Sequence, residues 1–320
     1  PPPPPPPPFS SRRRHTRLLT QSRGLGDVYK RQLLLAAGMF VLAREYAAAP
    51  WPSALGGLVM ATGGWTLWMD AAWWTPHLAS LSFTPWVWVA ARRVARGVGA
   101  PAWLVVAGAL CVTAGNPYSN VIVFLIVVGV AVEFGRRRAP ASLLALAGSL
   151  AAIGLIAIFA HVAFQQTSGV GQRETGVFND GSWTIGFGDL LTSSSPTATP
   201  SVRNFGNSVL GFPGFYLAWF VLPLAPWMRW RVLARREFLG LAVVAGSVLV
   251  LALGPSNFWF FRWPMRLLPY LHLPIVVGVA VVLGHGLVTV SRRRERTVTS
   301  TAIIAAGAYL AWADVPTDLG

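Results

Sequence analysis

Long stretches without a charged residue constrain this chain more than any other feature. Residues 143–164 and 267–290 are almost continuously apolar. Each holds roughly the twenty residues that an α-helix needs to cross a hydrocarbon layer about 30 Å thick. Because lipid offers the backbone no hydrogen-bond partners, such stretches must be helical. The sequence therefore predicts an all-α protein, a polytopic transmembrane helical bundle.

The composition supports this class of protein. Of the 320 residues, 54% are hydrophobic and 12% are charged, whereas a soluble domain carries about 25% charged residues. This balance excludes a soluble enzyme, a disulfide-rich secreted domain and a disordered chain. Cys111 is the only cysteine, so neither an intrachain disulfide nor a cysteine-based metal cluster can form.

The apolar runs after residue 32 predict about nine to ten membrane spans, several of them short. The runs cover residues 33–43, 54–69, 76–91, 101–115, 117–134, 141–164, 209–227, 238–254, 267–290 and 300–313. Together they define a transmembrane domain over residues 33–314, with a longer loop at about 165–208. Residues 315–320 are interpreted as a truncated tail.

Residues 1–32 share no pattern with this domain. Eight prolines open the chain and a basic stretch follows, which resembles translated sequencing-adapter sequence. The alternative is a disordered basic arm that binds anionic lipid. A basic arm on the inner side would invert every later span, so we interpret the segment as an artefact and expect the true N-terminus to be missing.

The net charge of +15 invites a nucleic-acid partner, but the positions of the arginines argue against one. They cluster in every second connector, at residues 92–96, 136–138, 229–236 and 292–296. The positive-inside rule makes these Arg-rich loops cytoplasmic. We therefore expect no nucleic-acid partner. The same rule predicts that the other connectors face outward, at residues 70–75, 115–120, 165–208 and 255–266.

The outward connectors carry the candidate site residues. Asp70 and His77 flank the first of them, where a carboxylate beside an imidazole can share a proton or hold a divalent cation. A capped, solvated turn is the structural alternative. Asn116 and Tyr118 belong to a tight Asn-Pro turn, which either serves structure alone or contacts a sugar or phosphate.

Two further pairs lie later in the chain. Glu174 and Asp180 belong to the long loop, which is either functional or an ordinary turn. Arg262 and Arg266 run against the positive-inside bias, and guanidinium groups bind phosphate in bidentate geometry; snorkelling to lipid headgroups is the alternative. Fifteen tryptophans predict an interfacial aromatic belt, or surfaces that stack on sugar rings.

The order of these features resembles the GT-C superfamily of integral-membrane glycosyltransferases and, within it, the bacterial YfhO-type membrane proteins. The likeness covers roughly residues 33–290. It rests on Leu81–Arg93, on the Gly115-Asn116-Pro117 turn, on Gly211–Tyr216 and on Phe261–Arg266. Those proteins have a Gly-His-Pro turn and an Arg-x-Pro-x-Arg segment in comparable places, so Asn116 departs from the pattern.

The resemblance implies that a sugar moves from a polyprenyl-phosphate donor to an envelope glycan or lipid acceptor, outside the bacterial plasma membrane. Arg262 and Arg266 would bind the lipid phosphate, with His77, Asn116, Tyr118, Glu174 and Asp180 as further substrate contacts. Asp70 would be an acidic catalytic contributor, because the main carboxylate is expected to be missing from this fragment. Mg²⁺ or Mn²⁺ stays open as a cofactor. The alternatives are a lipid-linked sugar transporter or flippase and a non-catalytic membrane scaffold.

Overall fold

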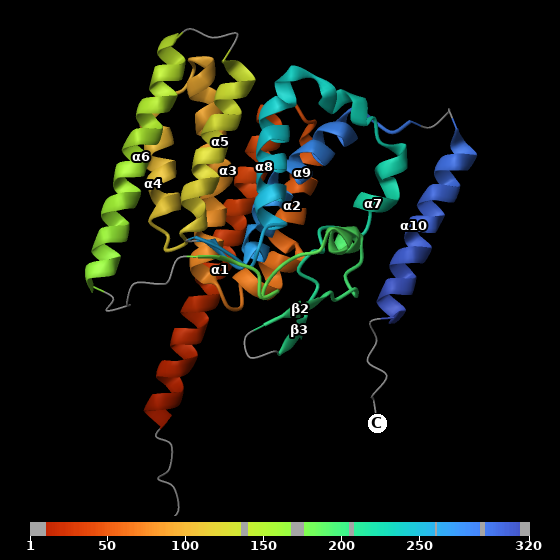
Figure 1. Cartoon of the computed structure of the whole chain (residues 1–320), viewed down its shortest axis with the longest axis horizontal. Coiled ribbons are helices and arrows are strands. Elements are labelled where there is room, and N and C mark those ends of the chain that lie inside the picture. Colours follow the sequence, from red (N-terminus) through yellow and green to blue (C-terminus); the bar gives the residue numbers. More distant parts are fainter. Residues whose placement is uncertain are drawn as a thin grey trace, which may run out of the picture.

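The computed structural model describes residues 11–135, 140–167, 176–204, 208–259, 261–288 and 292–313, with side chains from residue 26 onward. The chain is mostly helical (Figure 1). Its α-helices are α1 (Ser11–Glu45), α2 (Pro50–Thr62), α3 (Thr75–Arg96), α4 (Pro101–Val112), α5 (Tyr118–Phe134), α6 (Pro140–Thr167), α7 (Val221–Leu224), α8 (Leu239–Ala252), α9 (Leu268–Gly284) and α10 (Arg293–Ala313).

Short elements connect these helices. The helical turns are η1 (Thr66–Asp70, a π-helical turn), η2 (Phe187–Ser194), η4 (Ala225–Trp227), η5 (Trp230–Ala234), η6 (Arg236–Phe238) and η7 (Pro264–Leu267). The strands are β1 (Gly176–Phe178), β2 (Ser201–Arg203), β3 (Val209–Gly211), β4 (Asn257–Trp259) and β5 (Phe261–Arg262). They form an antiparallel β1-β4-β5 sheet and an antiparallel β2-β3 pair.

Helix α3 lies at the centre of the bundle and packs against α1, α4, α5 and α6. It starts with Pro76 in its first turn, where the missing N–H costs no helical hydrogen bond. It ends at Gly97, whose φ of 74° is left-handed and suits a residue without a Cβ. The first turn of α3 carries His77, and its last turn carries Arg93 and Arg96, so its two ends belong to two separate polar regions.

Two helices among the described residues are long and apolar enough to cross a membrane: Pro140–Thr167 and Pro264–Gly284, the latter comprising η7 and α9. Helix α6 exposes large apolar side chains along its length, among them Leu144 at 71% and Phe159 at 74%. Helix α9, in contrast, is mostly buried inside the bundle. Helices α4 and α5 are apolar but shorter.

The prediction of a single helix over residues 209–227 is wrong. This stretch contains β3, a series of turns, and only the four-residue α7 before η4. Pro213, Pro223 and Pro226 each lack the N–H that a helix interior needs, so hydrophobicity alone does not make this stretch a helix. From β3 the chain runs past α7 to the opposite end of the bundle, where α8 begins (Figure 1).

The other apolar runs each overlap a helix of the structure. The predicted boundary at residue 32 falls inside α1, which is one helix from Ser11 to Glu45. The run at 54–69 is shared by α2 and η1. Residues 1–10 and the predicted tail at 315–320 lie outside the described residues.

Candidate functional site

The connectors predicted to face outward meet at one end of the bundle. Strand β1, from the long loop, pairs with β4, which follows α8. The Tyr118 hydroxyl accepts a hydrogen bond from the Arg262 backbone N–H at 3.0 Å. The Met265 backbone N–H donates to the Trp183 carbonyl at 3.0 Å. Three segments far apart in sequence are thereby held against one another.

Asp70 and His77 form a buried pair at this end. Asp70 closes η1 and His77 lies in the first turn of α3, so the short connector brings their side chains together. Asp70 Oδ1 is 2.8 Å from His77 Nδ1, and Trp65 Nε1 donates to the same oxygen at 2.9 Å. Asp70 is 0% exposed and His77 is 4% exposed, which excludes the solvated turn.

His77 lies between two acceptor groups. Its Nε2 is 3.0 Å from the backbone carbonyl of Arg266, which can only accept a hydrogen bond, so this nitrogen is the donor. Its Nδ1 lies against the Asp70 carboxyl group. Burial raises the pKa of Asp70 above its ordinary value, and the neighbouring His77 opposes this shift. The two side chains therefore form a carboxyl–imidazole dyad.

The second oxygen of Asp70 has no partner. Asp70 Oδ2 is buried and accepts no hydrogen bond from the described residues. A buried acceptor without a donor is uncommon, because it loses its hydrogen bonds to water and gains none. This oxygen is thus the atom of the dyad at which a proton from another molecule can be accepted.

Arg266 lies beside the dyad between two indole rings. Its guanidinium carbon is 4.0 Å from the ring centre of Trp74 and 4.2 Å from that of Trp263. Rings on two sides stabilise the cation and restrict its side chain. Because Arg266 is half-buried and its backbone carbonyl contacts His77, the cation and the dyad form one site.

Strained tryptophans surround this site. Trp183 and Trp263 have φ values of 52° and 57°, a left-handed conformation that is unfavourable for residues other than glycine. The ring centres of Trp183 and Trp74 are 5.3 Å apart, and those of Trp183 and Trp263 are 6.3 Å apart. Such strain persists where surrounding contacts hold it and is frequent at functional sites.

Asn116 positions the site from the α4–α5 turn. Its Nδ2 donates to the Tyr270 hydroxyl at 2.8 Å and to Ser80 Oγ at 2.9 Å. Its Oδ1 accepts the backbone N–H of Tyr118 at 3.2 Å. Both ends of the carboxamide therefore bind within the protein, and the Tyr270 ring packs edge-on against His77 at 5.2 Å between centres.

The remaining predicted residues differ in their relation to the dyad. Arg262 lies in β5, half-buried, with its backbone bonded to Tyr118. Asp180 is exposed and uses Oδ1 to accept the Ser182 backbone N–H at 2.9 Å, so its carboxylate caps its own turn. Glu174 lies outside the described residues.

Sequence reasoning did not single out Trp183 or Tyr270 as site residues. The tryptophans of the connectors predicted to face outward could have pointed to Trp183, because one interpretation of them was a surface that stacks on sugar rings. Nothing in the sequence around Tyr270 marked it, because its role depends on contact with Ser80 and Asn116, more than 150 positions away in sequence.

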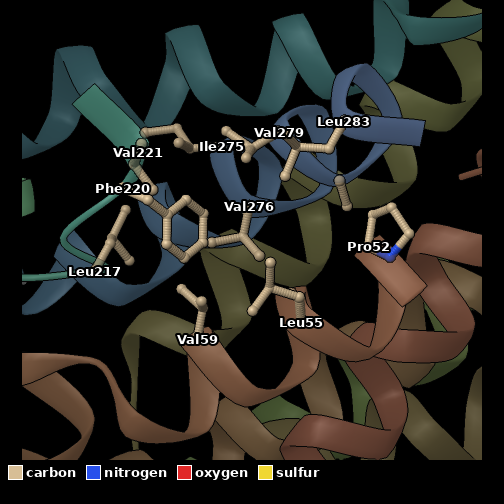
Figure 2. A pocket seen from close by; sticks show the side chains of 12 residues that line it. Pro52, Leu55, Val59, Leu217, Phe220, Val221, Ile275, Val276, Val279 and Leu283 are labelled. Carbon is tan, nitrogen blue, oxygen red and sulfur yellow. The ribbon is translucent and has the colours of Figure 1, made fainter. Parts of the chain in front are cut away.

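Two pockets of the structure lie away from the dyad. One is an apolar groove between α2, α7 and α9, where Val59, Leu217 and Val276 face one another (Figure 2). The other lies at the end of the bundle where α1 and α3 end. Aromatic rings pack against the dyad, since Trp65 and Tyr270 both contact the His77 ring.

The described residues contain no group of three or more His, Cys, Asp or Glu side chains that could hold a metal ion. Asp70 and His77 would supply two ligands, whereas catalytic metal sites typically have three from the protein. Among the described residues, Asp70 and His77 therefore form only part of a ligand set.

Comparison with known proteins gives no match: no family model, no curated protein and no solved structure matches this chain.

Proposed function

We propose that this chain is a multi-pass glycosyltransferase of the bacterial plasma membrane, which moves a sugar from a polyprenyl-phosphate donor to a cell-envelope acceptor. The observation that carries the proposal is the dyad of Asp70 and His77 beside Arg266. When a hydroxyl group displaces a lipid phosphate, the reaction needs a proton acceptor for the hydroxyl and a cation for the departing phosphate. The dyad and Arg266 provide these two groups side by side.

The membrane location is supported by exposed apolar surface. Helix α6 has no acidic or basic residue between Pro140 and Thr167 apart from His161, yet most of it is not covered by the bundle. Exposed apolar area of this size would favour aggregation in water. The 22 residues of α3 also make a helix about 33 Å long, close to the thickness of a hydrocarbon core.

The arrangement of charge supports the orientation. Three regions that carry arginines lie at the end of the bundle opposite to β2 and β3 (Figure 1). They are the C-terminal end of α3, the start of α8 and the start of α10. Trp227 Nε1 of η4 donates to Ser300 Oγ of α10 at 2.8 Å, which ties α10 to the segment that precedes α8. The arginines at 136–138 lie outside the described residues. This end is cytoplasmic in our proposal, so the dyad is extracytoplasmic.

The dyad and Arg266 divide the chemistry between them. Asp70 Oδ2 accepts the proton of the acceptor hydroxyl as the hydroxyl oxygen attacks the anomeric carbon. The bond from that carbon to the phosphate oxygen breaks, and its electron pair leaves with the lipid phosphate. Arg266 stabilises the departing phosphate, with Arg262 nearby on β5. His77 orients Asp70 and opposes the rise in its pKa. Direct displacement inverts the configuration at the anomeric carbon.

The test is a transfer assay with the purified full chain in lipid nanodiscs and a radiolabelled polyprenyl-phosphate sugar. Asp70→Asn and Arg266→Gln should each reduce the transfer rate at least about 100-fold, the usual size of general-base and charge-stabilising effects. Arg262→Gln should also abolish transfer while the protein stays inserted. The control is Arg231→Gln, an exposed arginine at the opposite end. Full activity in Asp70→Asn would refute the role of the dyad.

A non-catalytic scaffold is the second candidate, and the burial of the dyad favours it. Trp65 and Trp74 pack beside His77 and Asp70, which is also how a purely structural ion pair would be held. If the wild-type chain transfers no sugar and Asp70→Asn only lowers its thermal stability, the scaffold explains the site and the transferase proposal falls.

A further inference from the structure

A second polar region lies at the arginine-bearing end, between the C-terminal turns of α1 and α3. It is an open pocket of about 400 Å³. Arg44 and Glu45 line it from α1, and Arg93 and Arg96 line it from α3. The two helices pack side by side, and both end here, which brings the four charged side chains together.

The charges in this pocket do not balance. Glu45 is the one acidic side chain among its lining residues. One carboxylate oxygen lies 2.7 Å from Arg93 Nε, and the other pairs with Arg96. Two guanidinium groups thus pair with the single carboxylate, while Arg44, the third arginine of the lining, donates to the Ala48 backbone carbonyl. The Glu45 side chain is 9% exposed, so it holds the two α3 arginines from the floor of the pocket.

The arginines remain accessible from outside. The Arg93 and Arg96 side chains are 50% and 30% exposed, and Arg44 is exposed at the rim. Apolar residues border them: Phe40 is 36% exposed, and Val98, in the turn after Gly97, is 75% exposed. The guanidinium groups can bind the phosphate of a phospholipid, and the apolar residues beside them can contact the start of its acyl chains.

We propose that this pocket binds the phosphate group of an anionic phospholipid. Guanidinium groups bind phosphate oxygens through paired, charge-assisted hydrogen bonds, and basic pockets between membrane helices suit lipid headgroups. Helix α3 separates this pocket from the dyad by about 30 Å at 1.5 Å per residue. The proposal is therefore independent of any sugar transfer.

A purely topological role is the competing explanation of these arginines. Such a role depends on the number of positive charges at this end and on no particular geometry. A binding site depends on which arginines are present, and on Glu45. Variants that remove equal charge inside and outside the pocket separate the two explanations.

The experiment titrates the purified full chain, in phosphatidylcholine nanodiscs, with fluorescent phosphatidylglycerol. The double variant Arg93→Gln/Arg96→Gln should weaken binding about thirty-fold, on the order of a factor of five for each arginine. The matched control is Arg229→Gln/Arg231→Gln, which removes two exposed arginines at the same end. Equal losses in the two double variants would overturn the site.

Two further measurements keep the test decisive if the double variant does not fold. Glu45→Gln removes the one negative charge and should tighten phosphatidylglycerol binding several-fold, whereas Arg44→Gln should weaken it. Weaker binding in Glu45→Gln would contradict the proposal. Inorganic phosphate distinguishes the sources of the ligand: displacement of the lipid by millimolar phosphate would assign the pocket to a soluble phosphate compound and overturn the lipid assignment.

Discussion

At the scale of single residues, one buried ion pair connects three helices of the bundle. Arg92 and Glu133 are both buried, with 2.9 Å between a guanidinium nitrogen and a carboxylate oxygen. Tyr46 donates to Glu133 Oε2 at 3.3 Å, and its ring lies 3.4 Å below the Arg92 guanidinium carbon. Trp88 Nε1 donates to the Tyr46 hydroxyl at 3.1 Å. The pair therefore links α1, α3 and α5.

This network predicts an asymmetry between single and double substitutions. Arg92→Leu leaves the Glu133 carboxylate buried without its cation and should cost about 3–5 kcal/mol of unfolding free energy. Arg92→Met combined with Glu133→Leu should cost clearly less, because no charge stays buried. Denaturant unfolding in detergent measures both, with Arg231→Gln as the control. A single variant no less stable than this control would contradict the account.

At the scale of elements, glycines set how closely the helices pack. A Cβ on Gly57 of α2 would lie 2.5 Å from the Ala36 carbonyl oxygen of α1, so these two helices meet backbone to backbone. A Cβ on Gly154 of α6 would have no atom within 4 Å. The same residue type is thus essential in one helix and replaceable in the other.

Alanine substitutions should separate these two glycines. Gly57→Ala forces α1 and α2 apart and should cost about 1–3 kcal/mol of stability. Gly154→Ala should leave stability unchanged or raise it by up to about 1 kcal/mol, because alanine favours a helix more than glycine does. Thermal unfolding of the two purified variants makes the comparison. Equal effects would mean that α1 and α2 do not pack as closely as described.

At the scale of the whole molecule, the bundle separates two polar ends by a layer of apolar helices. Strands β2 and β3 lie at one end of the bundle, and the starts of α8 and α10 lie at the other (Figure 1). The dyad belongs to the first end, and the pocket lined by Arg44, Arg93 and Arg96 belongs to the second. This separation of polar groups along the helix axes matches the polarity profile of a bilayer. In our proposal the dyad and the lipid pocket therefore lie on opposite faces of the membrane.

Cysteine labelling tests this orientation directly. Cys111 is the only cysteine and is 0% exposed, so it can be replaced by alanine to give a clean background. In whole cells, a membrane-impermeant maleimide should label an exposed Thr197→Cys variant but label Ala234→Cys only after the membrane is permeabilised. The reverse pattern would invert the topology, and labelling of both in intact cells would argue against an inserted bundle.

The sequence alone determined most of the helices and the meeting of four connectors at one end of the bundle. Uncharged runs and their flanking arginines are local properties, because helix length and loop charge follow from neighbouring residues. The pairing of Asp70 with His77 was also foreseeable, since one short connector joins them. The helix expected over residues 209–227 failed for an equally local reason, its prolines.

Only the tertiary structure decided which residues complete the site. The Arg266 carbonyl contacts His77 across 189 positions of sequence, and Trp183 reaches Trp74 and Trp263 through the packing of loops. These contacts depend on how α3 and α9 lie against each other. Hydrophobic runs specify that both helices are buried or in lipid, but they do not specify the rotation and depth at which the helices pack.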